Sequence, residues 1–319
     1  MMKGAPMLAV FSSIMPIFLL ILLGNLLRRL PLFEDGFWQG LNRLGFYVLY
    51  PVLLFTSIYR ASFKELDALS IGLAFMGALT LMAILTLASW PLFRSRGMRG
   101  PQFSSIFQSS VRWNGFIALA IADALYSPEA VALVALIMAV IIIPIQLSTI
   151  TVIIALAETG DGKRPPLLRN LATNPLMLAV AFAILLKAMP FALPDFAMGT
   201  LDLLARAALG MGLLGVGAGL LLDDLAHPKF AAFLPIALKL FVLPMLVVGV
   251  GIAMGIDGDA LVFMALCASM PTAMNGYVVA KELGGDARFY AAVATLQTAV
   301  SFVSIPAILT ITERISGGG

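Results

Sequence analysis

The chain has 319 residues, of which 61% are hydrophobic and only 12% are charged, and its formal net charge is +3. A soluble protein of this length would expose far more charge, so the composition excludes a soluble globular domain and indicates a polytopic membrane protein. The small positive charge implies no nucleic-acid partner, because basic residues in short loops serve to orient membrane spans.

A helix that crosses a bilayer needs about 20 apolar residues. Ten stretches meet this requirement, at about 7–28, 37–58, 67–93, 104–125, 129–156, 171–189, 198–222, 230–255, 259–281 and 288–312. They predict an all-α membrane protein with ten transmembrane helices. The longest polar connection, 158–170, falls near the middle of the chain, and we expect it to be a cytoplasmic loop that separates a first half, 1–157, from a second half, 171–319.

The two halves carry the same features in the same order. An Asn-Gly pair begins at Asn114 in the fourth stretch and at Asn275 in the ninth, and a late proline follows at Pro144 and at Pro306. Five spans per half is an odd number, so the second copy must be inserted upside down. The sequence therefore predicts two inverted five-helix repeats.

The ninth stretch is interrupted in its middle by MPTAMNG at 270–276. Pro271 removes a backbone donor and Gly276 weakens the helix further, as Gly115 does in the fourth stretch. Lipid offers the freed peptide groups no partner, so such breaks persist only against protein or a water-filled cavity. Interrupted helices at matching places in two halves are typical of a transporter's substrate site. We therefore expect the two broken helices to cross at that site.

Side chains beside the two breaks are the candidate substrate ligands. Each asparagine can donate and accept hydrogen bonds, either to a substrate carboxylate or as a cap of its own helix. Arg112 can bind a carboxylate through two bonds, or can pair with Asp123 or with neighbouring backbone. Pro271 and Gly276 are expected to shape the break more than to bind. The predicted substrate-binding residues are Asn114, Gly115, Asn275, Gly276, Pro271, Thr272, Arg112 and Gln146.

Lys239 lies well inside the eighth stretch. An ammonium at that depth is costly and calls for a functional explanation. It can neutralise the negative ends of the broken helices or attract an anionic substrate. Alternatively, its long stem lets it reach the inner headgroups. We expect the interior role, as a charge-compensating or coupling residue.

No acidic residue falls at the middle of a predicted span, since Asp123, Asp202 and Glu282 lie toward span ends. Coupled carriers usually place a carboxylate at the coupling site, so its absence favours uncoupled export, with a proton- or sodium-coupled transporter as the alternative. An intramembrane enzyme would need more than the one histidine, His227. With the one cysteine, Cys267, a core residue, neither a metal nor a cofactor is expected. A non-transporting receptor or scaffold stays open.

The seventh stretch places Gly210, Gly212 and Gly215 in the spacing of a dinucleotide-binding fingerprint. No strand precedes them and the surrounding run is apolar, so a nucleotide site is not expected. Together with Gly217 and Gly219 they predict a face of small residues for close helix packing.

The distribution of Lys and Arg orients the chain. If the N-terminus lies outside, eleven basic residues fall in inner loops and five in outer segments. The positive-inside rule therefore favours both termini outside the cell.

Four sequence strings, taken in order, resemble the auxin efflux carrier family, which includes bacterial organic-acid permeases and the plant PIN-formed auxin exporters. They are FYVLYPVLLF at 46–55, Asn174-Pro175, Leu238-Lys239-Leu240 with the following Pro244, and the two Asn-Gly pairs. The resemblance covers nearly the whole chain.

The resemblance implies the fold of sodium/proton antiporters and an elevator mechanism. Spans 1, 2, 6 and 7 would form a scaffold that dimerises, and spans 3–5 and 8–10 would carry the substrate. The implied substrate is a small organic anion, either a carboxylate such as malate or an indole acid such as auxin, moved across the bacterial inner membrane. Family members break both crossing helices at prolines. The first break departs from that pattern, because no proline follows Asn114 before Pro128.

Overall fold

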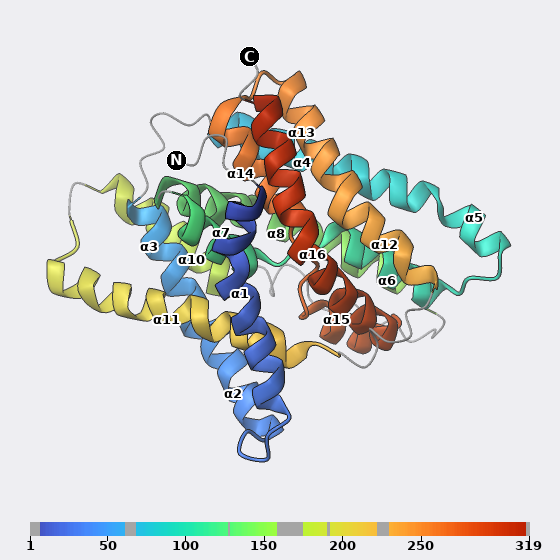
Figure 1. Cartoon of the computed structure of the whole chain (residues 1–319), viewed down its shortest axis with the longest axis horizontal. Helices are drawn as coiled ribbons and strands as arrows, with labels where there is room; N and C mark the ends of the chain where they lie inside the picture. Colours follow the sequence, from blue (N-terminus) through green and yellow to red (C-terminus); the bar gives the residue numbers. More distant parts are fainter. Residues whose placement is uncertain are drawn as a thin grey trace.

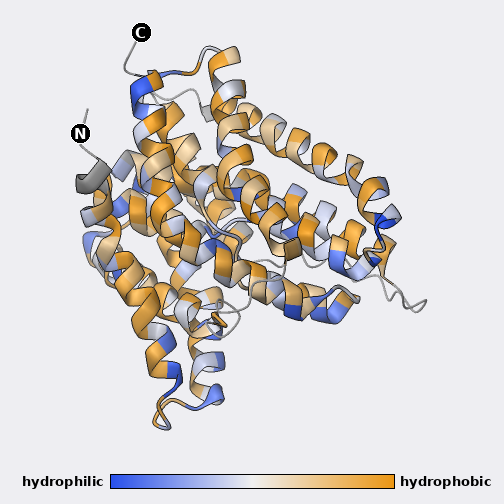
Figure 2. Ribbon diagram, turned by 45° about the vertical axis from the view of Figure 1, so that its right-hand side comes forward, coloured by the Kyte–Doolittle hydropathy of each residue, from blue (hydrophilic) through white to orange (hydrophobic). Residues whose placement is uncertain are grey.

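The computed structural model describes residues 7–60, 68–126, 128–157, 175–189, 192–221 and 230–316. All regular structure in these ranges is helical (Figure 1). Seven helices are long and apolar enough to cross a membrane by length and composition, and apolar residues dominate the ribbons (Figure 2). The chain is therefore an all-α, multi-pass membrane protein. The predicted loop 158–170, Asn174 and His227 lie outside the described residues.

In the first half, the helices follow the predicted stretches. Three of those stretches are composite: the second is a continuous helix with a π-helical turn, the third is divided into two helices at Ser89, and the fourth is interrupted. The elements are α1 (Met7–Arg28), α2 (Asp35–Leu44), η1 (Gly45–Leu49), α3 (Tyr50–Arg60), α4 (Ala68–Ala88), α5 (Trp90–Ser95), α6 (Gly100–Val111), α7 (Gly115–Leu125) and α8 (Pro128–Leu156).

The second half also has a π-helical turn, in the eighth stretch, and an interruption, in the ninth. The π-helical turn lies in the third stretch of this half, whereas it lies in the second stretch of the first half. The elements are α10 (Pro175–Ala188), α11 (Asp195–Gly219), η3 (Phe230–Ala232), α12 (Phe233–Ala237), η4 (Leu238–Val242), α13 (Leu243–Ala253), α14 (Gly258–Ser269), α15 (Gly276–Leu283) and α16 (Ala287–Ser316). Helices α10 and α14 are apolar but shorter than a full span.

The helices pack in two groups. Helix α1 packs along α11, and α3 packs against α10 and α11. In the other group α4 packs on α13, α14 on α13 and α16, and α8 on α6 and α7. Figure 1 shows α1, α3 and α11 crossing one another on one side, while α5, α12 and α15 lie on the other.

Glycines bring α1 and α11 into backbone contact. A Cβ added at Gly217 would overlap the carbonyl of Ile21, and one at Gly24 would overlap the carbonyl of Leu214. A Cβ added at Gly212 would lie 2.9 Å from the Tyr50 hydroxyl, a side-chain contact that is less tight than these two backbone contacts. The predicted close-packing face is therefore confirmed at Gly212, Gly215, Gly217 and Gly219, but not at Gly210, where an added Cβ would have nothing within 4 Å.

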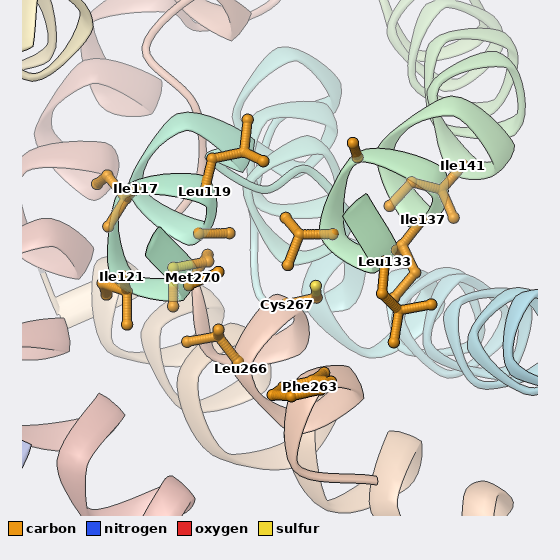
Figure 3. Close-up of a cluster of buried hydrophobic side chains, with 14 of the residues drawn as sticks. Ile117, Leu119, Ile121, Leu133, Ile137, Ile141, Phe263, Leu266, Cys267 and Met270 are labelled. Atoms are coloured by element: carbon orange, nitrogen blue, oxygen red, sulfur yellow. The ribbon is translucent and has the colours of Figure 1, made fainter. Parts of the chain in front are cut away.

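The hydrophobic core fills the space between α7, α8 and α14 (Figure 3). Ile121, Leu133 and Leu266 come from these three helices, and Cys267 lies among them, fully buried. Cys267 is therefore a small core residue, as expected. This core carries the helix ends that form the site described next.

Candidate functional site

The two predicted breaks meet in space. Helix α6 ends at Val111 and α14 ends at Ser269, and the chain is extended at Arg112, Asn114 and Met270. The backbone N–H of Asn114 donates a 2.8 Å hydrogen bond to the carbonyl of Pro271. Each interruption therefore supplies a partner for a peptide group that the other has freed. We call residues 112–114 and 270–275 together the crossing.

The two asparagines of the crossing differ in their hydrogen bonds and in their exposure. Asn114 is 2% exposed, and its Oδ1 accepts hydrogen bonds from the N–H groups of Phe116 (3.2 Å) and Ile117 (3.3 Å). It is the N-cap of α7, and the first break is thus present without a proline. Asn275 makes no cap bond to α15 and its side chain is exposed. At the start of α15 the N–H groups of Gly276 and Tyr277 donate instead to the carbonyls of Ala273 and Met274, so backbone and not a side chain caps this helix.

Arg112 is a buried cation held by neutral oxygens. It is 5% exposed, and its Nη1 donates to Oδ1 of Asn275 at 3.3 Å. Its Nη2 donates to Oε1 of Gln146 and, at 3.5 Å, to Oγ1 of Thr149. Its Nε has no partner among the described residues. Pairing with Asp123 is wrong, because that carboxylate is exposed on α7 beside a different cavity.

Two buried glutamines that the sequence analysis missed hold the second break in place. Gln297 of α16 accepts from the N–H of Thr272 at 2.9 Å and donates to the carbonyls of Ser109 (3.1 Å) and Pro235 (2.8 Å). Gln108 of α6 donates to the carbonyl of Gly276 at 2.9 Å. Both lie in apolar stretches, so the rule that polar groups inside spans are functional is the signal that could have found them.

The remaining candidates of the second break pack behind it. The Thr272 hydroxyl and the Tyr290 hydroxyl are 2.7 Å apart, and the Tyr290 hydroxyl donates to the carbonyl of Ala273 at 2.7 Å. A Cβ at Gly276 would overlap the Tyr290 ring. Pro271, Thr272 and Gly276 are buried, and they shape the crossing rather than line a cavity.

Lys239 points into the protein. It lies in the π-helical turn η4, is 1% exposed, and its Nζ donates a 3.2 Å hydrogen bond to the carbonyl of Ala268. Ala268 is in the last turn of α14, where the free carbonyls carry partial negative charge. The ammonium therefore sits at the negative end of a broken helix and not at the surface.

Two adjoining cavities open beside the crossing. The larger has a volume of about 980 Å³ and is lined by Arg112, Asn114, Gly115, Asn275 and Gln146, together with aromatic and apolar side chains of η1, α7 and α8. The second, of about 540 Å³, shares Asn114 and Asn275 and extends along α11. A small organic molecule fits either volume.

A third cavity, of about 470 Å³, lies at the other end of α3 and α11. It contains the 2.6 Å ion pair between Arg60 and Asp202. The rings of Tyr50 and Phe116, which line the cavity of about 540 Å³ at the crossing, stack with their centroids 3.7 Å apart.

A multi-pass helical protein in which two interrupted helices cross beside large cavities is a membrane transporter. Comparison with known families agrees: the family described as "Membrane transport protein" matches residues 9–309. The chain belongs to this family, the auxin efflux carrier family.

Proteins that are similar to this chain over most of its length are also named as transporters. An "Uncharacterized transporter" of Methanothermobacter thermautotrophicus is 25% identical over 298 residues, which cover 92% of this chain and 96% of that protein. The "Uncharacterized transporter YfdV" of Escherichia coli is 26% identical over 292 residues, which cover 85% and 87% of the two chains. These names agree with a transporter and not an enzyme.

The unequal asparagines lead to a first prediction. Asn275→Ala is expected to lower the rate of transport and to lower the melting temperature less than Asn114→Ala does, because Asn275 caps no helix and its one bond, from Nη1 of Arg112, is long at 3.3 Å and lies beside a cavity. Asn114→Ala is expected to lower both, with about 1 kcal/mol lost in stability through the missing N-cap. Transport into proteoliposomes and thermal unfolding in detergent measure the two effects. Equal melting temperatures for the two variants would contradict the assignment.

Proposed function

We propose that this protein is a secondary carrier that moves small organic anions, either carboxylates or auxin-like indole acids, across the inner membrane. The observation that carries the proposal is Arg112, a buried guanidinium that contacts only neutral oxygens and lines a cavity of about 980 Å³. A carboxylate is the ligand that best completes such a site, since it accepts two parallel hydrogen bonds. The dipole of α15, which begins directly after Asn275, adds a favourable field for an anion.

The mechanism we propose is that of an elevator built from two inverted repeats, 1–157 and 171–319. In such a plan α1 corresponds to α10 and α3 to α11, so the packing of α1 on α11 should recur as α10 on α3. Both pairs are in contact. The scaffold would consist of α1, α2–α3, α10 and α11, and the remaining spans would carry the substrate. The cavities at the crossing lie between these groups, which is where a moving site must load.

Assembly and location belong to the same proposal. The scaffold helices would form a homodimer in a bacterial plasma membrane, with both termini outside. Lys239 would compensate charge at the crossing: it neutralises the carbonyl end of α14, and this partial charge would otherwise repel an anion near the same helix.

The energetic consequence is our second prediction, which tests the function. Transport is expected to be electrogenic and to need no sodium or proton gradient, because no carboxylate contacts Arg112 or Lys239 in the described part of the chain. One net charge gains about 2.3 kcal/mol per 100 mV, so an inside-negative potential drives a monoanion outward by roughly fiftyfold. Efflux of radiolabelled malonate and of indole-3-acetate from proteoliposomes under a potassium diffusion potential measures this.

The same experiment separates the alternatives. Flux that appears only with a sodium or pH gradient would favour a coupled transporter of the same fold. No flux of either anion under any gradient would favour a receptor or scaffold that does not transport. Empty liposomes and liposomes with a denatured sample serve as controls for leakage of the protonated acids.

A further inference from the structure

We infer that Gln146 occupies the place of the substrate carboxylate on Arg112, so that one neutral amide determines that this carrier binds anions without protons. The inference rests on the proposed function and adds to it a residue that sets ion specificity. It begins with the observation that the amide oxygen of Gln146 is bonded to Nη2 of Arg112 at the edge of the larger cavity.

Gln146 lies at a position from which a side chain can compete with a substrate for the guanidinium of Arg112. It follows Pro144 by two residues in α8, and Thr149, one turn later, adds a second oxygen to the same Nη2 at 3.5 Å. The other terminal nitrogen, Nη1, is held by Asn275 at 3.3 Å. All three oxygens are neutral, and Nε is left without a partner. The guanidinium is therefore held in place but not neutralised.

A neutral side chain and an acidic side chain at position 146 have opposite effects on the binding of a substrate carboxylate. An incoming carboxylate forms charge-assisted bonds that are about twice as strong as bonds to an amide, so it can displace the amide oxygen of Gln146. A carboxylate tethered at the same position would instead bind Arg112 with a high effective concentration and exclude the substrate. Only a proton could then release the guanidinium.

Other titratable groups face this site from the elements packed around it. Arg43 and Tyr47 line the cavity from α2 and η1, Glu282 lines it from α15, and Tyr290 of α16 lies near Arg112. None of these replaces the contact between Arg112 and Gln146 in the described residues. These groups are the same in the unmodified protein and in the Gln146→Glu variant. Any pH dependence that only the variant shows can therefore be assigned to the introduced carboxyl.

The experiment is Gln146→Glu in the full-length protein in proteoliposomes, with malonate and indole-3-acetate as probes. At neutral pH the variant is expected to bind both anions at least tenfold more weakly than the unmodified protein, because a buried ion pair replaces a displaceable amide. On acidification the affinity for malonate should recover, since protonation of the introduced carboxyl frees Arg112. The unmodified protein should show no such recovery.

Gln39→Glu is the matched control. Gln39 lines the edge of the same cavity from α2 and is exposed, so the change adds the same charge away from Arg112. No activation by acid is expected for it. If acidification activated Gln39→Glu as strongly as Gln146→Glu, a negative charge anywhere in the cavity would explain the effect. The inference would then fail.

A substrate-free measurement keeps the test independent of the probes. Gln146→Glu alone should leave the melting temperature near that of the unmodified protein at neutral pH. The same change in an Arg112→Gln background should lower it strongly, because it buries an unpaired carboxylate. If Gln146→Glu and Arg112→Gln changed the melting temperature additively, the two positions would not interact and the inference would be overturned.

The two proposals fail differently. If the unmodified protein moves neither anion while the melting-temperature cycle shows coupling, the proposed substrate class is wrong but the Arg112–Gln146 contact stands. If the unmodified protein transports and Gln146→Glu transports equally well at neutral pH, the function stands and the inference falls.

Discussion

Arg112→Gln is expected to reduce anion transport by about a hundredfold or more and to leave the protein folded. A hydrogen-bonded charge contributes up to about 3 kcal/mol, and here the guanidinium is the only cation that touches both the second break and the cavity among the described residues. Folding should not suffer, because a buried charge with no acidic partner gains little from being there. Uptake kinetics and thermal unfolding, measured on the same preparation, give the two quantities.

Arg112→Lys is the informative companion. Lysine keeps the charge but not the planar pair of donors, so transport is expected to fall between that of Arg112→Gln and that of the unmodified protein. If Arg112→Gln transported at the normal rate, Arg112 would be a structural residue and the anion site would have to be sought elsewhere in the cavities.

Gly217→Ala is expected to give the largest loss of stability. Its new methyl group would overlap the carbonyl of Ile21 where α1 and α11 are in backbone contact, and overpacking of this kind costs about 1–3 kcal/mol or more. Gly210→Ala in the same helix is the matched control, because the space around it is open. Replacement of a helical glycine by alanine there should stabilise by up to about 1 kcal/mol.

The measurement is the melting temperature and the yield of monodisperse protein in detergent for the two alanine variants. A destabilised Gly217→Ala beside a neutral or stabilised Gly210→Ala separates packing from helix propensity. Equal shifts would mean that α1 and α11 can move apart at no cost, and the scaffold would then not be rigid.

Much of the fold could be predicted because membrane spans are dictated by composition. The described helices follow the predicted stretches, and the breaks at Asn114 and Asn275 were visible because polar and helix-breaking residues are rare inside apolar runs. The interior position of Lys239 was likewise visible from its depth in the eighth stretch. These are properties of one segment at a time, which a sequence records directly.

What the sequence could not specify depends on partners far apart in the chain. The roles of Asn114 and Asn275 were equivalent by sequence, yet Asn114 caps α7 and Asn275 accepts a hydrogen bond from Arg112, although both line the cavity. Gln297 looked like an isolated polar residue until its three partners, from three different segments, were in place. Gly210 matched its neighbours by spacing but packs against nothing.

The hydrogen bond that joins the two breaks also has a consequence for biosynthesis. The N–H of Asn114 is satisfied by Pro271, which the ribosome adds 157 residues later. At about 5–20 residues per second, the first broken helix therefore waits roughly 10–30 s in the membrane with that amide lacking its final partner. During this interval water, lipid headgroups or the insertion machinery must shield the freed peptide groups. The crossing is consequently one of the last parts of the protein to form, and defects in the second half should be detected by quality control as misfolding of the first.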